Sequence, residues 1–235
     1  MRFAALALLL AAPATAQSAA SPAASPAASP AASPAASPAA SPAAEYITPG
    51  QDEAGYRAWA MADPARPPAV AAYYAFLSQH GVAGIVPTWQ LLRTATDWQR
   101  CAAQPFEVPP AEQWAHIVET LDYVRAHVVP VVGPVEPVSV YRNPVLNACA
   151  HGAPESAHAL LYAIDLVPLR SIGREGLIRS LCAIHLWRGT GFDVGLGFYK
   201  GLRFHVDSKK FRKWGGDGNG ESSPCTAVIA ELGSG

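Results

Sequence analysis

A histidine and an aspartate, seven residues apart, interrupt the otherwise apolar run Ser156-Ala-His-Ala-Leu-Leu-Tyr-Ala-Ile-Asp-Leu166. A polar group buried in a protein costs free energy unless it has a partner, so His158 and Asp165 each need one. A second run, residues 202–207, encloses His205 in the same manner. A divalent metal satisfies two imidazoles and a carboxylate at once. These residue types therefore predict a metal site; the alternative is three core residues that are hydrogen-bonded independently.

The second run alternates between apolar and ionisable side chains. Neighbouring side chains of a β-strand point to opposite faces, so this strand would have one apolar face and one ionisable face. We expect the apolar face to lie on the core and the ionisable face to lie in a cleft, with an ordinary solvated strand face as the alternative. The apolar side chains are Leu202, Phe204 and Val206, and the ionisable ones are Arg203, His205 and Asp207.

The spacing of the first two candidate ligands constrains the local backbone. In one straight strand, His158 and Asp165 would lie about 23 Å apart, and in one helix about 10 Å apart. Zinc bonds in proteins are only about 2 Å long. If both residues bind one ion, the chain must bend back around residues 159–162, with His158 on a loop or strand end and Asp165 on the strand that follows.

Proline and hydrophobic periodicity predict helices in the first part of the folded region. One begins at Pro67-Pro68 and stops at Gly81, a second follows Pro87, and a third runs from Pro109-Pro110 to Pro130. The apolar residues of these helices are predicted to form core.

The later part of the chain predicts strands over residues 138–141, 163–167, 194–199 and 202–207, the last two joined by a tight hairpin at Lys200-Gly201. One helix, capped by Ser171, is inserted between them and carries His185 on its core side. The order predicts an α+β fold: N-terminal helices followed by a small, mainly antiparallel sheet that carries the metal site, with one inserted helix.

The N-terminus has the features of an export signal. A basic residue, an apolar stretch and a small-residue cleavage pattern predict a signal peptide over residues 1–16, either removed or kept as an anchor. Residues 17–45 are predicted to be an extended linker, because Ser-Pro-Ala-Ala repeats over residues 21–44 and a proline every fourth residue blocks helices and sheets. Residues 46–235 form the predicted folded domain. We expect a periplasmic or secreted protein without a transmembrane span after cleavage.

Four cysteines fit an oxidising compartment, where an even number favours disulfides, with three possible connectivities. We expect Cys101 to pair with Cys149, and Cys182 with Cys225. The net charge of −1, with 17 Lys plus Arg, excludes a broad electrostatic surface for nucleic acid. We expect a monomer.

Three motifs, in order and at plausible spacing, resemble the zinc D-Ala-D-Ala metallopeptidases of bacterial cell walls. They are Ser139-x-Tyr-Arg142, Ser156-x-His-(x)4-Ala-x-Asp165 and His205-x-Asp207, and the likeness covers roughly residues 130–214. That family includes D,D-carboxypeptidases and murein endopeptidases. The resemblance implies a zinc-dependent hydrolase of peptidoglycan peptides that contain D-amino acids, and it leaves open which of the two activities applies.

The resemblance also assigns roles to residues. It implies that His158, Asp165 and His205 bind zinc and leave a fourth position open, as in catalytic zinc sites. Arg142 would contact either the substrate carbonyl oxygen or a terminal carboxylate.

Three further positions complete the predicted site. The resemblance implies that Ser156 helps to orient the peptide and that Asp207 fixes the ring of His205. Arg203 shares the ionisable strand face and is a second predicted substrate-binding residue.

Two positions depart from the family pattern. Leu161 stands where the family often has glycine, which implies a different bend or a bulkier pocket wall. Leu202 and Arg203 stand where members commonly place a general base, and neither can accept a proton at neutral pH.

The proton acceptor must therefore come from elsewhere, and the candidates are Asp207, Glu155 and His151. The alternative function is a catalytically inactive, zinc-binding domain of the same fold that associates with the wall. A weaker third alternative is a zinc hydrolase of a different amide.

Overall fold

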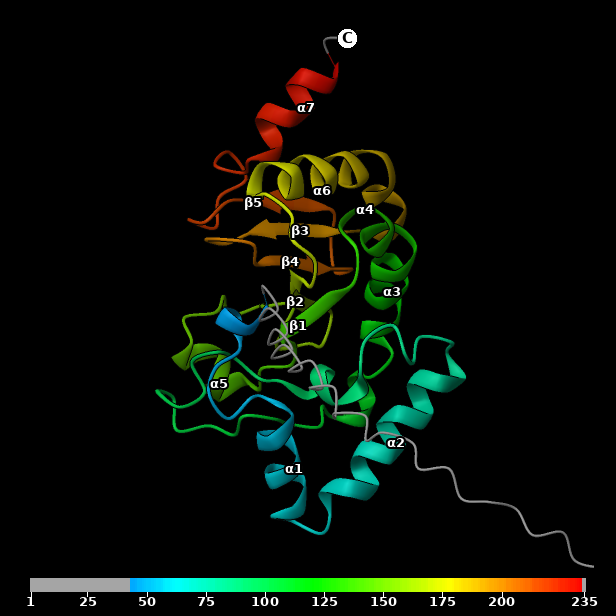
Figure 1. Ribbon diagram of the computed structural model, residues 1–235, viewed down its shortest axis with the longest axis vertical. Helices are drawn as coiled ribbons and strands as arrows, with labels where there is room; N and C mark the ends of the chain where they lie inside the picture. The colour runs from blue at the N-terminus through cyan, green and yellow to red at the C-terminus, as the bar shows by residue number, and fades with distance from the viewer. Residues whose placement is uncertain (1–42, 234–235) are drawn as a thin grey trace, which may run out of the picture. The chain divides into compact units, whose positions relative to one another are not determined.

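The computed structural model describes residues 43–233 (Figure 1). It confirms an α+β fold, in which N-terminal helices precede a five-stranded, mostly antiparallel mixed sheet with interspersed helices. The predicted signal peptide and residues 17–42 of the predicted linker lie outside the described part of the chain. The start of the folded domain at residue 46 remains a prediction.

The secondary structure follows in chain order. The helices are α1 (Glu53–Met61), α2 (Arg66–Gln79), α3 (His116–Tyr123), α4 (Val129–Val132), α5 (Pro144–Cys149), α6 (Arg174–Arg188) and α7 (Cys225–Gly233). The strands are β1 (Val135–Ser139), β2 (Ala163–Pro168), β3 (Gly195–Phe198), β4 (Phe204–Asp207) and β5 (Arg212–Trp214). Short 3₁₀ helices lie at Ala44–Tyr46, Thr88–Leu92, Ala111–Gln113 and Gly189–Phe192, and a π-helical turn lies at Val124–Val128.

The sheet has the strand order β1-β2-β4-β3-β5. Neighbouring strands are antiparallel except β3 and β5, which are parallel. β3 and β4 form the predicted hairpin, in which Gly201 has a φ of +68°, a conformation that glycine adopts at no steric cost. β5 adds to the predicted sheet an edge strand of three residues, too short to show an alternating pattern.

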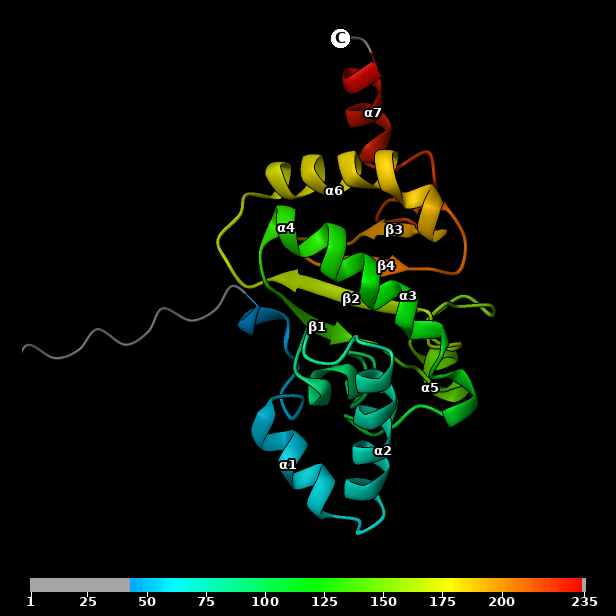
Figure 2. The same ribbon diagram turned by 90° about the vertical axis from the view of Figure 1, so that its right-hand side faces the viewer.

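The predicted two-faced strand is confirmed over Phe204–Asp207, whereas the predicted first residues, Leu202 and Arg203, precede β4. Phe204 and Val206 are fully buried in the main hydrophobic core, together with Ile164 and Leu166 of β2. Helices α3 and α4 cross this face, and α6 packs against α4 (Figure 2). The other face of β2 and β4 is also buried, but it carries the ionisable side chains. One sheet face thus builds the core and the other builds the site.

The third predicted helix differs from expectation at its end. Helix α3 passes through the π-helical turn into α4, so the prediction that Pro130 ends it is wrong. Pro130 lies at the start of α4, directly after the π-helical turn. The helical run ends instead at Gly133, whose φ of +82° is left-handed.

Smaller differences concern the boundaries of other elements. The segment after Pro87 forms only a 3₁₀ helix, and β1 begins at Val135 rather than at residue 138. The N-cap of α6 is Gly173, so the prediction that Ser171 caps this helix is wrong. His185 is a core residue, as predicted: it is buried, and its Nε2 lies 3.0 Å from the carbonyl oxygen of Val194.

Both predicted disulfides are confirmed. Cys101 pairs with Cys149 at the end of α5, and Cys182 of α6 pairs with Cys225 of α7. Two disulfides indicate an oxidising, extracytoplasmic environment. Within the described residues, every helix is too short or too polar to span a membrane.

Two glycines of β3 make room for large side chains on the site face. A Cβ at Gly197 would collide with the ring of Trp214, and a Cβ at Gly195 would collide with Asp207. The alternate residues Leu196 and Phe198 point to the core. The pattern Gly-Leu-Gly-Phe therefore packs one face tightly and leaves space on the other.

Replacing Gly197 with alanine should destabilise the fold, because the Trp214 ring would have to move. We expect a loss of about 1–3 kcal/mol in the free energy of unfolding, the usual cost of overpacking. Urea unfolding followed by circular dichroism measures this loss. Gly191→Ala is the matched control, because nothing lies within 4 Å of its added Cβ. Equal losses in the two variants would contradict the explanation.

Candidate metal centre

The sheet and one turn bring the three predicted ligands together. In the β2–β4 pair, Asp165 stands directly opposite His205. His158 precedes β2, and the chain bends back after it as expected: the N–H of Leu161 donates to the carbonyl oxygen of His158 (3.3 Å). All three side chains are buried, with exposures of 2%, 0% and 4% for His158, Asp165 and His205.

Three atoms of these side chains form a nearly equilateral triangle. Nε2 of His158 lies 3.1 Å from Nδ1 of His205 and 3.2 Å from Oδ1 of Asp165. Nδ1 of His205 lies 3.0 Å from the same oxygen. In a tetrahedral zinc site with bonds of about 2.0–2.1 Å, two ligand atoms lie about 3.3 Å apart. The triangle therefore has the dimensions of one face of such a site.

The remaining ring nitrogens fix the tautomers of both histidines. Nδ1 of His158 lies 2.6 Å from the carbonyl oxygen of Val140, which can only accept, so this nitrogen carries the hydrogen. Nε2 of His205 donates in the same way to Oδ2 of Asp207 (2.8 Å). In the neutral rings, Nε2 of His158 and Nδ1 of His205 then present lone pairs toward Asp165. Two imidazole lone pairs and a carboxylate oxygen thus converge, and Nη2 of Arg142 donates to the Nε2 lone pair of His158 (3.3 Å). The group can hold a metal ion.

The electrostatics of the site favour an ionised carboxylate. Burial opposes the charge on Asp165, but the Arg203 guanidinium and the hydrogen bond from His205 hold its pKa well below the ordinary value. Burial, assisted by Arg142, lowers the pKa of His158 to about 4, so its ring is neutral. Burial also opposes the charge on His205, but hydrogen bonds to Asp165 and Asp207 raise its pKa. The ring of His205 is thus more readily protonated than that of His158.

The second oxygen of Asp165 is held by two arginines. Oδ2 accepts from Arg142 (2.7 Å) and from Arg203 (2.6 Å). Nε of Arg142 donates in turn to the hydroxyl of Ser139 (3.0 Å), and the guanidinium of Arg203 lies over the ring of Tyr199. These contacts orient the carboxylate so that Oδ1 points to the histidines.

Asp207 is placed to orient His205, as the resemblance implies. It is fully buried, and both its oxygens accept from Arg212. Burial raises the pKa of Asp207, but His205 and Arg212 outweigh it and bring the pKa to about 2. The backbone N–H of Lys209 donates to Oδ1 as well (2.9 Å). All these partners make Asp207 a positioning residue.

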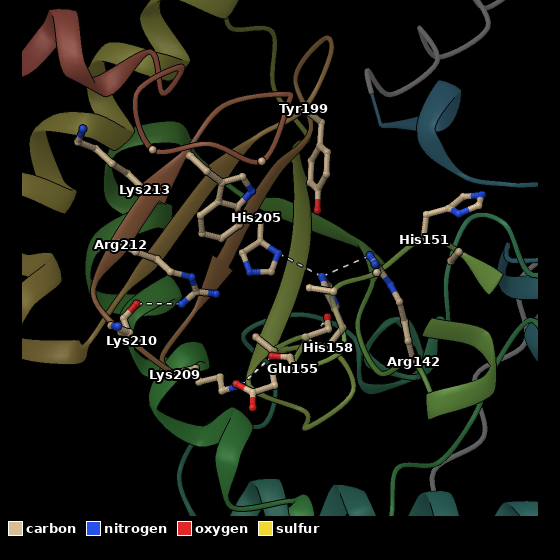
Figure 3. Close-up of a pocket in the computed structure, with 18 residues that line it drawn as sticks. Arg142, His151, Glu155, His158, Tyr199, His205, Lys209, Lys210, Arg212 and Lys213 are labelled. Carbon is tan, nitrogen blue, oxygen red and sulfur yellow. Dashed lines mark hydrogen bonds between the residues drawn. The ribbon is translucent and has the colours of Figure 1, made fainter. Parts of the chain in front are cut away.

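A cleft of about 940 Å³ opens over the metal centre (Figure 3). Its lining includes Arg142, His158 and His205, together with the loop of residues 150–157 and basic residues after β4. Buried ligands beneath an open cleft are the arrangement of a site that takes up a substrate rather than of a closed structural site.

Some of the other predicted site residues line the cleft, whereas Arg203 contacts the Asp165 carboxylate beneath it. Ser156 lines the cleft, and its hydroxyl accepts from the N–H of His158 (3.3 Å). His151 and Glu155, two candidate proton acceptors, also line it. Arg203 is not among the lining residues and is directed to Asp165.

The structure adds two residues that were not predicted. The hydroxyl of Tyr199 donates to Oδ1 of Asp165 (3.1 Å), and the ring of Trp214 lies 4.8 Å from that of His205. The alternation of β3 could have revealed Tyr199, because it shares a face with Gly195 and Gly197. Trp214 comes from the edge strand that has no sequence pattern.

The three metal ligands and Arg142 come from the motifs on which the resemblance to zinc D-Ala-D-Ala metallopeptidases rests. Comparisons with protein-family models, with curated proteins and with solved structures found no match to this chain. The geometry supports a metal site. Membership of the peptidase family remains a prediction.

The purified protein should bind one Zn²⁺ per chain, and a chelator should lower its melting temperature. At a free zinc concentration of 100 times the Kd, binding to the native state stabilises the protein by about 2.7 kcal/mol. His158→Ala and Asp165→Ala should abolish this shift. Asp207→Asn should weaken binding about tenfold, the lower end for an outer partner of a ligand. Elemental analysis and calorimetric titration measure both effects.

His80→Ala is the matched control for metal binding, because His80 is exposed at the end of α2. Zinc binding that survives unchanged in His158→Ala would rule out this centre.

The structure shows why leucine can stand at position 161, where the family often has glycine. The φ of Leu161, +59°, lies in the left-handed region, where glycine is favoured, yet its side chain is fully buried. Leu161→Gly should relieve about 1 kcal/mol of backbone strain but lose about 2–5 kcal/mol of buried side chain. We expect a net loss of stability, measured by urea unfolding, with zinc binding retained. A glycine variant more stable than the native protein would contradict this balance.

Proposed function

We propose that the protein is a zinc-dependent peptidase, periplasmic or secreted, that hydrolyses bonds of D-amino acids in peptidoglycan peptides. The observation that carries this proposal is the set of three converging ligands, with both histidine tautomers fixed, beneath an open cleft. The motif resemblance supplies the substrate class. A bound zinc ion would lower the pKa of a water molecule and polarise the scissile carbonyl.

Arg142 is the residue of the chain best placed to bind the substrate. It lines the cleft, and its Nε and Nη2 are held by Ser139 and Asp165. Its other terminal nitrogen, Nη1, makes no hydrogen bond with any described residue. This nitrogen can donate to a peptide carbonyl oxygen or a terminal carboxylate, while the rest of the guanidinium stays fixed.

The proton acceptor is proposed to lie on the loop of residues 150–157. Glu155 and His151 line the cleft from this loop, and neither side chain is committed to a hydrogen bond with a described residue. Asp207, the third candidate, is fully engaged by His205, Arg212 and Lys209. Asp207 therefore contributes through the ring of His205.

A second candidate function follows from a specific observation. The positions where the family commonly places its base hold Leu202 and Arg203, and Arg203 is used to hold Asp165. A domain that keeps the metal without a working proton acceptor would bind the wall without cleaving it.

Incubation of the protein with purified muropeptides, followed by mass spectrometry, tests both functions. A peptidase should release D-alanine or split cross-links, should lose this activity with a chelator, and should lose it in His158→Ala. Free D-alanine identifies a carboxypeptidase, and split cross-links identify an endopeptidase. Glu155→Gln and His151→Ala should show which residue takes the proton, as a lower kcat with unchanged zinc content.

The control variant is His80→Ala, which should cleave like the native protein. Activity retained in His158→Ala would contradict the proposal. Binding to sacculi without any product, at high protein concentration and full zinc occupancy, would favour the non-catalytic domain.

A further inference from the structure

Positive charge is concentrated in the cleft. The chain has only four lysines, at positions 200, 209, 210 and 213, and three of them line the cleft. Arg142 and Arg212 line it too, against a single lining carboxylate, that of Glu155. Figure 3 shows Lys210, Arg212 and Lys213 on one side of His205. A protein with a net charge of −1 thus carries a strongly basic wall at one place.

The arginines and the lysines of this wall differ in what neutralises them. Arg212 is paired with the carboxylate of Asp207, and Arg142 with that of Asp165. Within residues 43–233, the lysines have no such counterion. The ammonium of Lys209 donates to the backbone carbonyl of Glu155 (2.7 Å), and that of Lys213 donates to the hydroxyl of Thr226 (2.9 Å).

Lys210 is exposed, and its ammonium makes no hydrogen bond or ion pair with the part of the chain that the structure describes. Neutral acceptors leave an ammonium charge uncompensated, so the charges of Lys209 and Lys210 at the cleft are not neutralised by the described residues. Like charges lining one cleft create a positive potential that attracts anionic ligands.

We propose that Lys209 and Lys210 bind a free carboxylate of the peptide substrate, away from the bond that is cleaved. The cleft would then prefer wall peptides with free side-chain carboxylates over the same peptides with these groups amidated. This inference rests on the proposed function, because that function identifies the ligand as a wall peptide. The uncompensated lysines are the reason to expect a preference for free carboxylates.

The test compares two synthetic pentapeptides of the wall type, both ending in D-Ala-D-Ala. One has free side-chain carboxylates, and the other has them amidated. Calorimetric titration gives the Kd of each for the native protein and for the double variant Lys209→Gln/Lys210→Gln. We expect the double variant to bind the acidic peptide about five- to tenfold more weakly, as expected for two partly exposed ion pairs, and to bind the amidated peptide unchanged.

Lys200→Gln is the matched control, because it removes the same charge from the fourth lysine, in the β3–β4 turn outside the cleft. It should bind both peptides like the native protein. Lys209→Arg/Lys210→Arg should restore the affinity for the acidic peptide, and higher salt should weaken this affinity alone. Circular dichroism verifies that each variant is folded.

The outcomes separate this inference from the proposed function. Acid-selective binding that depends on the lysines, without cleavage of either peptide, would support the basic wall and refute the peptidase. Cleavage of both peptides with equal kcat/KM, unchanged in the double variant, would support the peptidase and overturn the role of the lysines. Equal affinity of the native protein for the two peptides, or no binding of either, would also overturn that role.

Discussion

The antiparallel register of β2 and β4 is the constraint on which the site depends. It sets Asp165 opposite His205 on one face, while Ile164 and Val206 face each other on the other. A slip of one residue would turn the ionisable pair into the helix-covered core, where burying charge is costly. The apolar residues therefore fix the register for the ligands. The register that packs the core therefore also brings the candidate ligands together.

Buried charge then dictates what surrounds the ligands. An isolated carboxylate at full burial would be unstable, so Asp165 is matched by guanidinium groups that reach it from outside β2. The cleft walls are tied down in a similar way. The loop of residues 150–157 starts directly after Cys149, and the glycine-rich loop after β5 leads to Cys225, so a disulfide anchors one end of each. Rigid ends help to hold cleft residues in place over the ligands.

Alternation and residue type carried the predictable part of this structure. The two-faced strand follows from the alternation, the bend after His158 follows from the spacing of two ligands of one ion, and the choice of ligands was completed by the resemblance of the motifs. Features that depend on non-local contacts could not be predicted. Pro130 continues a helix because a π-helical turn precedes it, and Arg203 looks like a cleft residue until Asp165 is placed beside it. Neither neighbour is visible from the local sequence.

The two departures from the family pattern have structural uses in this chain. Leu161 accepts a left-handed backbone and in return fills the core beneath the bend. Arg203 stands where the family commonly has a proton acceptor, and its guanidinium donates to the Asp165 carboxylate and holds it in place. With Arg203 in this role and Asp207 committed to His205, the strand that bears the second histidine has no free base left. Glu155 and His151, on the loop that lines the cleft, are then the remaining candidates for the proton acceptor.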